Sequence, residues 1–137
     1  MKLFLDSSAF AKRFVEESGS GEVERLCSRA TELGLSVICV PEIMSALNRR
    51  LREKNLIRQD YTRAKQRLSE EVRDAVILNL TPDVIQASID VLEGNPLRTL
   101  DALHVACAVA WDADLFVSAD HRQIAAAKSV GLITKQV

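Results

Sequence analysis

Four acidic residues, spread along the whole chain, occupy positions from which their side chains could meet. Asp6, Glu42 and Asp120 each follow a predicted strand by no more than two residues. Asp101 lies instead in the first turn of an alanine-rich helical pattern that covers residues 99–111. In open α/β sheets, ligands bind at the edge where strands end and helices begin. The sequence therefore predicts that these acids line that edge.

The place of Asp101 follows from the direction of its helix. Only a few residues separate the helical pattern from the apolar run at 115–117, so the helix and the following strand run antiparallel. The start of the helix, with Asp101 in its first turn, then returns to the carboxyl ends of the strands. We therefore expect four carboxylates along one edge of the sheet.

These acids have two interpretations. Any one of them could simply cap a helix or interact favourably with its dipole, and Asp120 with Gln123 resembles a capping box. Four carboxylates together repel one another and raise one another's pKa, a conflict that a bound divalent cation resolves. Because the ligands would be oxygen atoms, with no cysteine or histidine pair nearby, Mg²⁺ or Mn²⁺ is favoured over zinc.

Short apolar runs alternate with longer helical patterns along the chain. The runs are predicted to be strands, at residues 2–5, 35–40, 75–80, 114–118 and 132–134. The helical patterns cover residues 7–16, 21–33, 41–54, 58–73, 82–92, 99–111 and 121–129. Gly34 is predicted to end the second helix, and Pro41 to open the third.

This alternation predicts the fold. Strands that are apolar on both faces favour a parallel sheet that is covered on two sides. Residues 1–137 are therefore predicted to form a single domain of the α/β class. Its architecture would be a three-layer α/β/α sandwich around a central, mainly parallel sheet of about five strands.

Composition narrows the class of protein. Apolar residues make up 47% of the 137 and charged residues 27%, which is typical of a folded globular protein. The net charge of −1 excludes a polycation, and no apolar run is long enough to span a membrane. Three cysteines, distant from one another, disfavour both a disulfide framework and a zinc site. We therefore expect a soluble protein of the reducing cytoplasm.

Four segments occur in the order that PIN-domain proteins show. They are Leu5-Asp6-Ser7-Ser8-Ala9, Pro41-Glu42-Ile43-Met44-Ser45-Ala46-Leu47, Leu100-Asp101-Ala102-Leu103-His104-Val105-Ala106 and Phe116-Val117-Ser118-Ala119-Asp120. No single segment is specific, but the resemblance covers the whole chain. The sequence thus resembles the PIN domain and, more narrowly, the VapC-type toxins of prokaryotic toxin–antitoxin pairs.

The resemblance implies an activity and a set of partners. It implies an endoribonuclease that depends on Mg²⁺ or Mn²⁺, forms a homodimer, and is paired with a cognate antitoxin. Its acidic site corresponds to Asp6, Glu42, Asp101 and Asp120. Ser8 and Ser118 match small polar positions of the family and are expected to support the acids. In the mechanism we expect, the three aspartates hold metal, and Glu42 binds a second ion or orients water.

Basic residues gather in one part of the chain. Residues 49–67 hold eight basic and two acidic side chains. Within this stretch, Arg49, Arg50 and Arg52 have three interpretations: they contact RNA phosphates, an acidic antitoxin, or only solvent. Outside this stretch, Lys12 could bind a phosphate near the metal or belong to a solvated helix face.

Three other residues have expected places relative to the acids. His104, one turn after Asp101, could orient that carboxylate by a hydrogen bond or simply pack on the sheet. Asp114 opens a strand and is expected at the opposite, amino edge. Arg52 is about 15 Å from Glu42 along their common helix, too far for a role in the chemistry.

Three other classes of protein fit parts of the pattern. A phospho-acceptor receiver domain needs an acid pair after its first strand, where this chain has Ser7 and Ser8. A haloacid-dehalogenase-like phosphatase needs a second Asp two residues after Asp6, and Ser8 stands there. A PIN-like module that binds a metal or a partner without catalytic activity is excluded least well. A metal-dependent cleavage assay separates that module from an enzyme.

Overall fold

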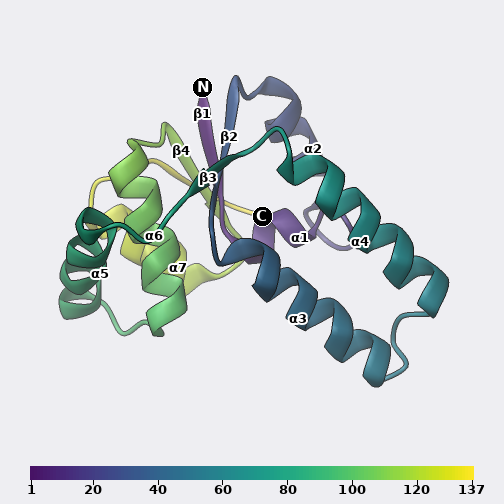
Figure 1. Ribbon diagram of the computed structural model, residues 1–137. Helices are drawn as coiled ribbons and strands as arrows, with labels where there is room; N and C mark the ends of the chain where they lie inside the picture. Colours follow the sequence, from purple (N-terminus) through teal and green to yellow (C-terminus); the bar gives the residue numbers. More distant parts are fainter.

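Five short strands form the centre of the protein, whose residues 1–137 are all described by a computed structural model (Figure 1). In chain order they are β1 (Lys2–Leu5), β2 (Glu32–Ser36), β3 (Val76–Leu78), β4 (Leu115–Ser118) and β5 (Thr134–Gln136). Their order across the sheet is β3-β2-β1-β4-β5, and every neighbouring pair is parallel. The chain therefore steps from β1 to one side and later to the other. Open α/β sheets bind ligands where the strand order reverses in this way.

Seven helices cover the two faces of the sheet. They are α1 (Ser7–Ala11), α2 (Ser20–Arg29), α3 (Cys39–Arg52), α4 (Arg58–Val72), α5 (Pro82–Gly94), α6 (Thr99–Trp111) and α7 (His121–Ser129). Figure 1 shows α5, α6 and α7 on one side of the sheet, and α1 to α4 on the other. The predicted three-layer sandwich around a parallel sheet is thus confirmed. None of the helices combines the length and the apolar character needed to cross a bilayer.

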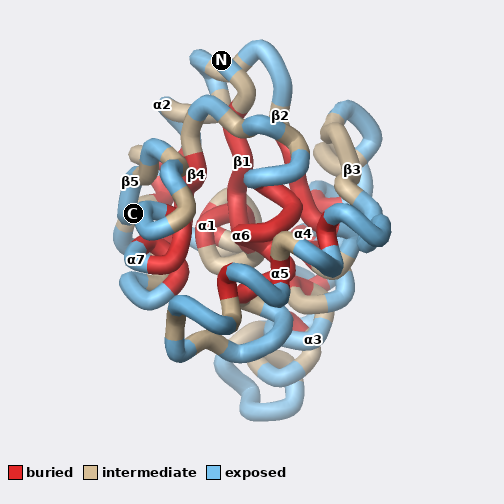
Figure 2. Tube along the Cα trace, turned by 90° about the vertical axis from the view of Figure 1, so that its left-hand side faces the viewer, coloured by how far each residue is buried: buried red, intermediate tan, exposed pale blue.

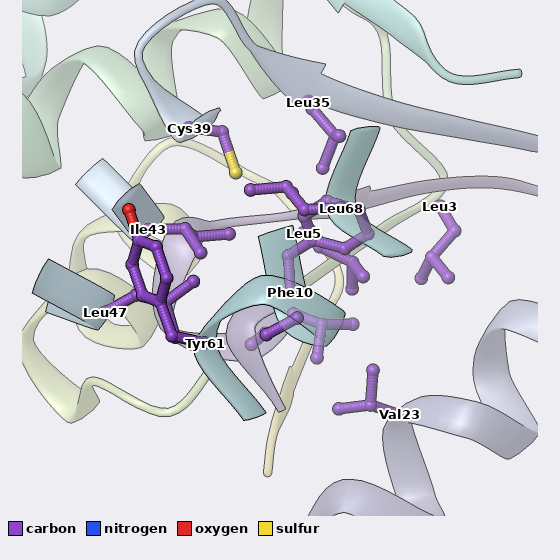
Figure 3. Packing of buried hydrophobic residues seen from close by; sticks show 13 residues of the cluster. Leu3, Leu5, Phe10, Val23, Leu35, Cys39, Ile43, Leu47, Tyr61 and Leu68 are labelled. Carbon is purple, nitrogen blue, oxygen red and sulfur yellow. The ribbon is translucent and has the colours of Figure 1, made fainter. Parts of the chain in front are cut away.

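Alternate side chains of the strands supply two separate cores. Leu3 and Leu5 of β1 pack among residues of α1 to α4 (Figure 3). Phe4 points to the other face, where it stacks on Phe116 with 5.8 Å between ring centroids and meets α5, α6 and α7. This alternation follows because successive strand residues point to opposite faces of a sheet. Figure 2 shows the inner strands β1, β2 and β4 as largely buried.

The predicted strand at 35–40 is wrong at both ends, because β2 begins earlier, at Glu32, and residues 37–40 lie outside it. β2 ends at Ser36, and α3 already begins at Cys39. A short apolar run does not distinguish a strand from a buried turn of helix. Here Cys39 and Ile43, one turn apart, are both buried against the sheet, so this part of the run belongs to the helix. Pro41 therefore lies within the first turn instead of opening the helix, and its missing N–H needs no partner there.

The prediction that Gly34 ends a helix is also wrong. α2 stops at Arg29, earlier than the predicted 21–33, and Gly34 lies inside β2, paired with both β1 and β3. A Cβ atom built on Gly34 would lie 2.5 Å from the ring of Trp111. Glycine is required at this position because the partly buried indole ring lies directly against the backbone. Glycine marks close approaches in strands as well as helix ends, so its sequence signal is ambiguous.

The other boundaries differ from the predicted ones by a few residues. α1 ends early, at Ala11, and the predicted strand at 75–80 keeps only three residues. The last strand lies two residues later than the predicted 132–134. The helices predicted at 99–111 and 121–129 are confirmed at both ends. The deviations concern short elements, whose ends depend on neighbours more than on local pattern.

Gly34→Ala is expected to lower the free energy of unfolding by about 1–3 kcal/mol, because the added methyl group overlaps the Trp111 ring. Gly94→Ala is the matched control, since nothing lies within 4 Å of a Cβ atom there and alanine favours the helix. We expect that variant to be at least as stable as the unchanged protein. Urea unfolding measures the free energy of unfolding of both variants. Equal stabilities of the two would contradict the packing argument.

Candidate active site

Asp6 follows the central strand β1 and is completely buried. Its Oδ1 atom accepts a hydrogen bond from the Ala9 backbone at 2.9 Å, so the carboxylate caps α1. The Ser8 hydroxyl donates to it at 2.8 and 2.9 Å, and the Ser118 hydroxyl donates to Oδ2 at 2.6 Å. Burial raises the pKa of Asp6 above its usual value, although these hydrogen bonds act in the opposite direction. Asp6 therefore caps α1 and is at the same time a buried carboxylate that its hydrogen bonds hold in one orientation.

The two serines connect the carboxyl ends of β1 and β4. Ser118 is buried at the end of β4, and its hydroxyl oxygen accepts a hydrogen bond from the Asp120 backbone at 2.9 Å. The Ser8 hydroxyl accepts one from the Ala119 backbone at 3.0 Å. The Asp120 carboxylate in turn accepts from the Arg122 backbone at 2.8 Å and caps α7. One hydroxyl, that of Ser118, therefore contacts two of the predicted acidic positions.

Glu42 lies in the first turn of α3, as predicted, although β2 ends earlier than expected. Its Oε1 atom accepts the Ser7 hydroxyl at 2.7 Å and lies 2.5 Å from Nε2 of His104. The second contact requires the hydrogen of the His104 ring to sit on Nε2 when Glu42 is ionised. Burial acts to raise the pKa of Glu42, but the hydrogen bonds from His104 and Ser7 outweigh it and lower the pKa.

His104 is therefore a partner of Glu42, not of Asp101 as one of its two interpretations held. The imidazole is 1% exposed, and its Nδ1 atom has no hydrogen-bond partner. Ser7 has no chemical signal of its own in the sequence. Only its place directly after Asp6, on the first turn of a helix, could have indicated its role.

Asp101 stands in the first turn of α6 and is bonded to a residue of α7. Its Oδ1 atom accepts a hydrogen bond from the Gln123 side-chain amide at 3.1 Å, and Gln123 is 4% exposed. The predicted capping box between Asp120 and Gln123 is absent, because the Asp120 backbone N–H is bonded to Ser118 instead. Gln123 instead connects α7 to the acid of the neighbouring helix.

Three of the acids act electrostatically on the fourth, Asp101. Burial raises the pKa of Asp101, and the negative charges of Asp120, Glu42 and Asp6 raise it further against the opposite effect of the nearby imidazole. Glu42, Asp101 and Asp120 each accept their hydrogen bonds through only one of their two carboxylate oxygens. Their second oxygens are therefore available to a ligand. The donor set consists of hard oxygen atoms, which suit Mg²⁺ or Mn²⁺. No three acid, histidine or cysteine side chains converge closely enough to enclose an ion by themselves.

The predicted basic contacts have different surroundings. Lys12 is buried, and its ammonium group donates to the Ser18 carbonyl at 2.5 Å and pairs with Glu17 at 3.5 Å. The expectation that Lys12 lies on a solvated helix face is therefore wrong, and its charge is already paired within the protein. Arg49 and Arg52 are exposed on α3, and Arg50 lies between them, partly buried.

Several solved structures have the same architecture. The toxin VapC20 of Mycobacterium tuberculosis, described as cleaving the sarcin–ricin loop, superposes with a TM-score of 0.70 at 18% identity. The match covers 98% of this chain and 99% of that one. DNA-bound VapBC of Salmonella typhimurium gives a TM-score of 0.71 at 13% identity, covering 99% and 98%. VapBC2 of Rickettsia felis, bound to a promoter fragment, gives 0.70 at 13% identity, covering 100% and 99%.

At such low identities these likenesses concern the fold, and no curated protein matches the chain in sequence. The sequence profile of the PIN domain, however, matches residues 3–129, which is nearly the whole chain. This range includes all four acids and the two serines that connect β1 to β4. The chain, with its five-stranded parallel sheet and the acids at its carboxyl edge, belongs to the PIN-domain family.

Proposed function

We propose that this protein is a metal-dependent endoribonuclease of the VapC type, the toxin of a toxin–antitoxin pair. The observation that carries the proposal is the electrostatic conflict at Asp101, whose pKa is raised by burial and then by three neighbouring acids. Helix capping does not account for Asp101, because its side chain accepts a hydrogen bond from Gln123 of α7 and from no backbone N–H of α6. The toxins with the same fold support the choice of substrate and biological class.

The oxygen atoms of the four acids suit a divalent cation, Mg²⁺ or Mn²⁺, although these side chains do not converge closely enough to enclose one by themselves. Asp6, Asp101 and Asp120 would hold it, and Glu42 would hold a second ion or a water molecule. When bound, such a cation supplies positive charge that stabilises the phosphate in the transition state and lowers the pKa of water.

The protein's own contacts define what each acid contributes to hydrolysis. Ser8 of α1 and Ser118 of β4 hold the Asp6 carboxylate in one orientation. Hydrogen bonds to one oxygen of Glu42 keep that side chain ionised, and the other oxygen remains free to accept a hydrogen bond from the attacking water. The water would then pass a proton to Glu42 and attack the phosphorus in line, while the bond from phosphorus to the leaving ribose oxygen breaks and that oxygen takes up a proton from solvent, with no covalent enzyme intermediate.

We further propose a cognate antitoxin and a second copy of the chain as partners, in the cytoplasm. Two of the proteins with this fold are VapBC assemblies, which supports an antitoxin. The three cysteines are free thiols, which suits a reducing compartment.

The proposal is tested by linkage between metal binding and folding. Mn²⁺ at about 100 times its dissociation constant is expected to stabilise the fold by roughly 2.7 kcal/mol, because the site exists only in the folded chain. Differential scanning calorimetry measures the shift in Tm, and Asp6→Asn is expected to remove most of it. RNA cleavage measured in Mn²⁺ and in EDTA completes the test.

The outcomes of this experiment are distinct. A Tm shift together with cleavage that EDTA abolishes supports the enzyme. A shift without cleavage of any RNA supports the binding module that lacks activity. No shift at millimolar Mn²⁺ contradicts a metal site at these acids.

A further inference from the structure

A groove of about 450 Å³ opens beside the acidic site, on the side of α3. It is lined by Ile38, Pro41, Glu42, Ser45, Arg49 and Leu100. One of its lining residues, Glu42, is itself one of the four acids, and Leu100 directly precedes Asp101 in α6. The groove is thus continuous with the proposed centre of hydrolysis.

One ridge of α3 forms a long wall of this groove. Glu42, Ser45 and Arg49 are spaced i, i+3 and i+7, so they share one face of the helix. At about 1.5 Å per residue, Arg49 lies roughly 10 Å from Glu42 along the axis. Helical side chains lean toward the helix N-terminus, so the Arg49 guanidinium leans toward Glu42. This lean brings the Arg49 guanidinium toward the Glu42 end of the groove.

The charge and the walls of the groove identify a ligand class. Arg49 is exposed and takes part in none of the ion pairs of the protein, so its five N–H donors are available. A guanidinium binds phosphate through two parallel hydrogen bonds. The groove also has an apolar lining, from Ile38 and Pro41 at the start of α3 and from Leu100 of α6, which is 46% exposed. An anion with an attached apolar face complements this combination.

We propose that this groove is the subsite for a nucleotide that flanks the scissile phosphate in single-stranded RNA. Arg49 binds a backbone phosphate one or two nucleotides from the cleaved bond, and the apolar wall contacts the ribose or base of that nucleotide. The proposal rests on the proposed ribonuclease function, because only a strand whose cleaved phosphate lies at the acids continues into the groove. Contact with the backbone also makes the subsite tolerant of sequence.

The same helix provides a matched control. Arg52 is also exposed and unpaired, but at 100° per residue it lies about 60° from Arg49 around the helix axis, one turn farther from Glu42, and it does not line this groove. Arg50 points to the opposite side of the ridge, where it lines a cavity together with Arg13 and Phe14. Arg49→Gln and Arg52→Gln therefore remove the same charge from the same helix, inside and outside the groove.

The experiment measures binding of a fluorescently labelled single-stranded RNA 12-mer by anisotropy over a range of salt concentrations. Asp101→Asn in EDTA serves as the parent, so that the RNA stays intact. Arg49→Gln in this parent is expected to flatten the slope of log affinity against log salt by about 0.7 and to weaken binding about fivefold at 0.1 M salt. Arg52→Gln is expected to leave the slope unchanged.

A second measurement locates the phosphate. A scan with single uncharged methylphosphonate linkages is expected to find one position at which the parent loses about fivefold in affinity and Arg49→Gln loses nothing further. Equal slope changes for Arg49→Gln and Arg52→Gln, or losses that add at every linkage, overturn the subsite. A parent that binds no RNA at all contradicts the ribonuclease proposal itself. Binding by the parent with an unchanged slope in Arg49→Gln contradicts only the subsite.

Discussion

Asp101→Asn is expected to reduce RNA cleavage by about three orders of magnitude while raising the Tm measured in EDTA. The loss of activity follows from removing one of the charged groups that position the cation and the phosphate, a class of change with effects of this size. The gain in stability follows because Asp101 is repelled by Asp120, Glu42 and Asp6, a conflict that a neutral amide relieves. An Asn oxygen can still accept the hydrogen bond from Gln123.

The control for this prediction lies at the opposite edge of the sheet. Asp114 precedes β4, and its Oδ2 atom accepts a hydrogen bond from the Lys2 backbone at 2.6 Å, so it stands at the amino edge as predicted. Asp114→Asn is expected to keep the cleavage rate. A lower Tm of Asp101→Asn in EDTA would instead favour the simple interpretation of Asp101 as a residue that stabilises the helix dipole.

Ser118→Ala is expected to reduce cleavage and Mn²⁺ affinity by about 10–100-fold, the usual effect of losing a group that orients a metal ligand. The Ser118 hydroxyl donates to Asp6 at 2.6 Å and accepts from the Asp120 backbone at 2.9 Å. Alanine would leave both groups without this partner, which is expected to cost about 1–3 kcal/mol of stability. Single-turnover cleavage, Mn²⁺ titration calorimetry and urea unfolding measure the three effects separately.

A second buried serine separates the orienting role from the general cost of such a substitution. Ser88 is 6% exposed, and its hydroxyl donates to the Ile85 carbonyl within α5 at 2.6 Å. Ser88→Ala is expected to leave cleavage and Mn²⁺ affinity unchanged. Similar losses of activity in Ser88→Ala and Ser118→Ala would mean that reduced stability, and not the orientation of Asp6, explains the effect.

Most of the longer helices of this protein could be predicted from sequence to within two residues, α2 being the exception because it ends four residues early. α6 is alanine-rich and starts after Arg98, and α7 is preceded by Asp120, whose side chain caps it. In these two helices the pattern and the residues at their starts agree, so local sequence suffices. The region around Gly34 and Cys39 could not be predicted, because a buried apolar run suits a strand or a helix equally and only the neighbouring Trp111 ring and sheet decide between them.

The candidate site shows the same division between local and distant interactions. The sequence alone determined that Asp6, Glu42, Asp101 and Asp120 come at strand ends or helix starts. Because the carboxyl ends of parallel strands share one edge of the sheet, these positions predicted that the acids line that edge. The tertiary structure decided which donor holds each of them. His104 reaches Glu42 from another helix and Ser118 reaches Asp6 from a neighbouring strand. Such pairings join residues far apart in the chain, and they exist only once packing of the helices on the sheet has brought their side chains within hydrogen-bond distance.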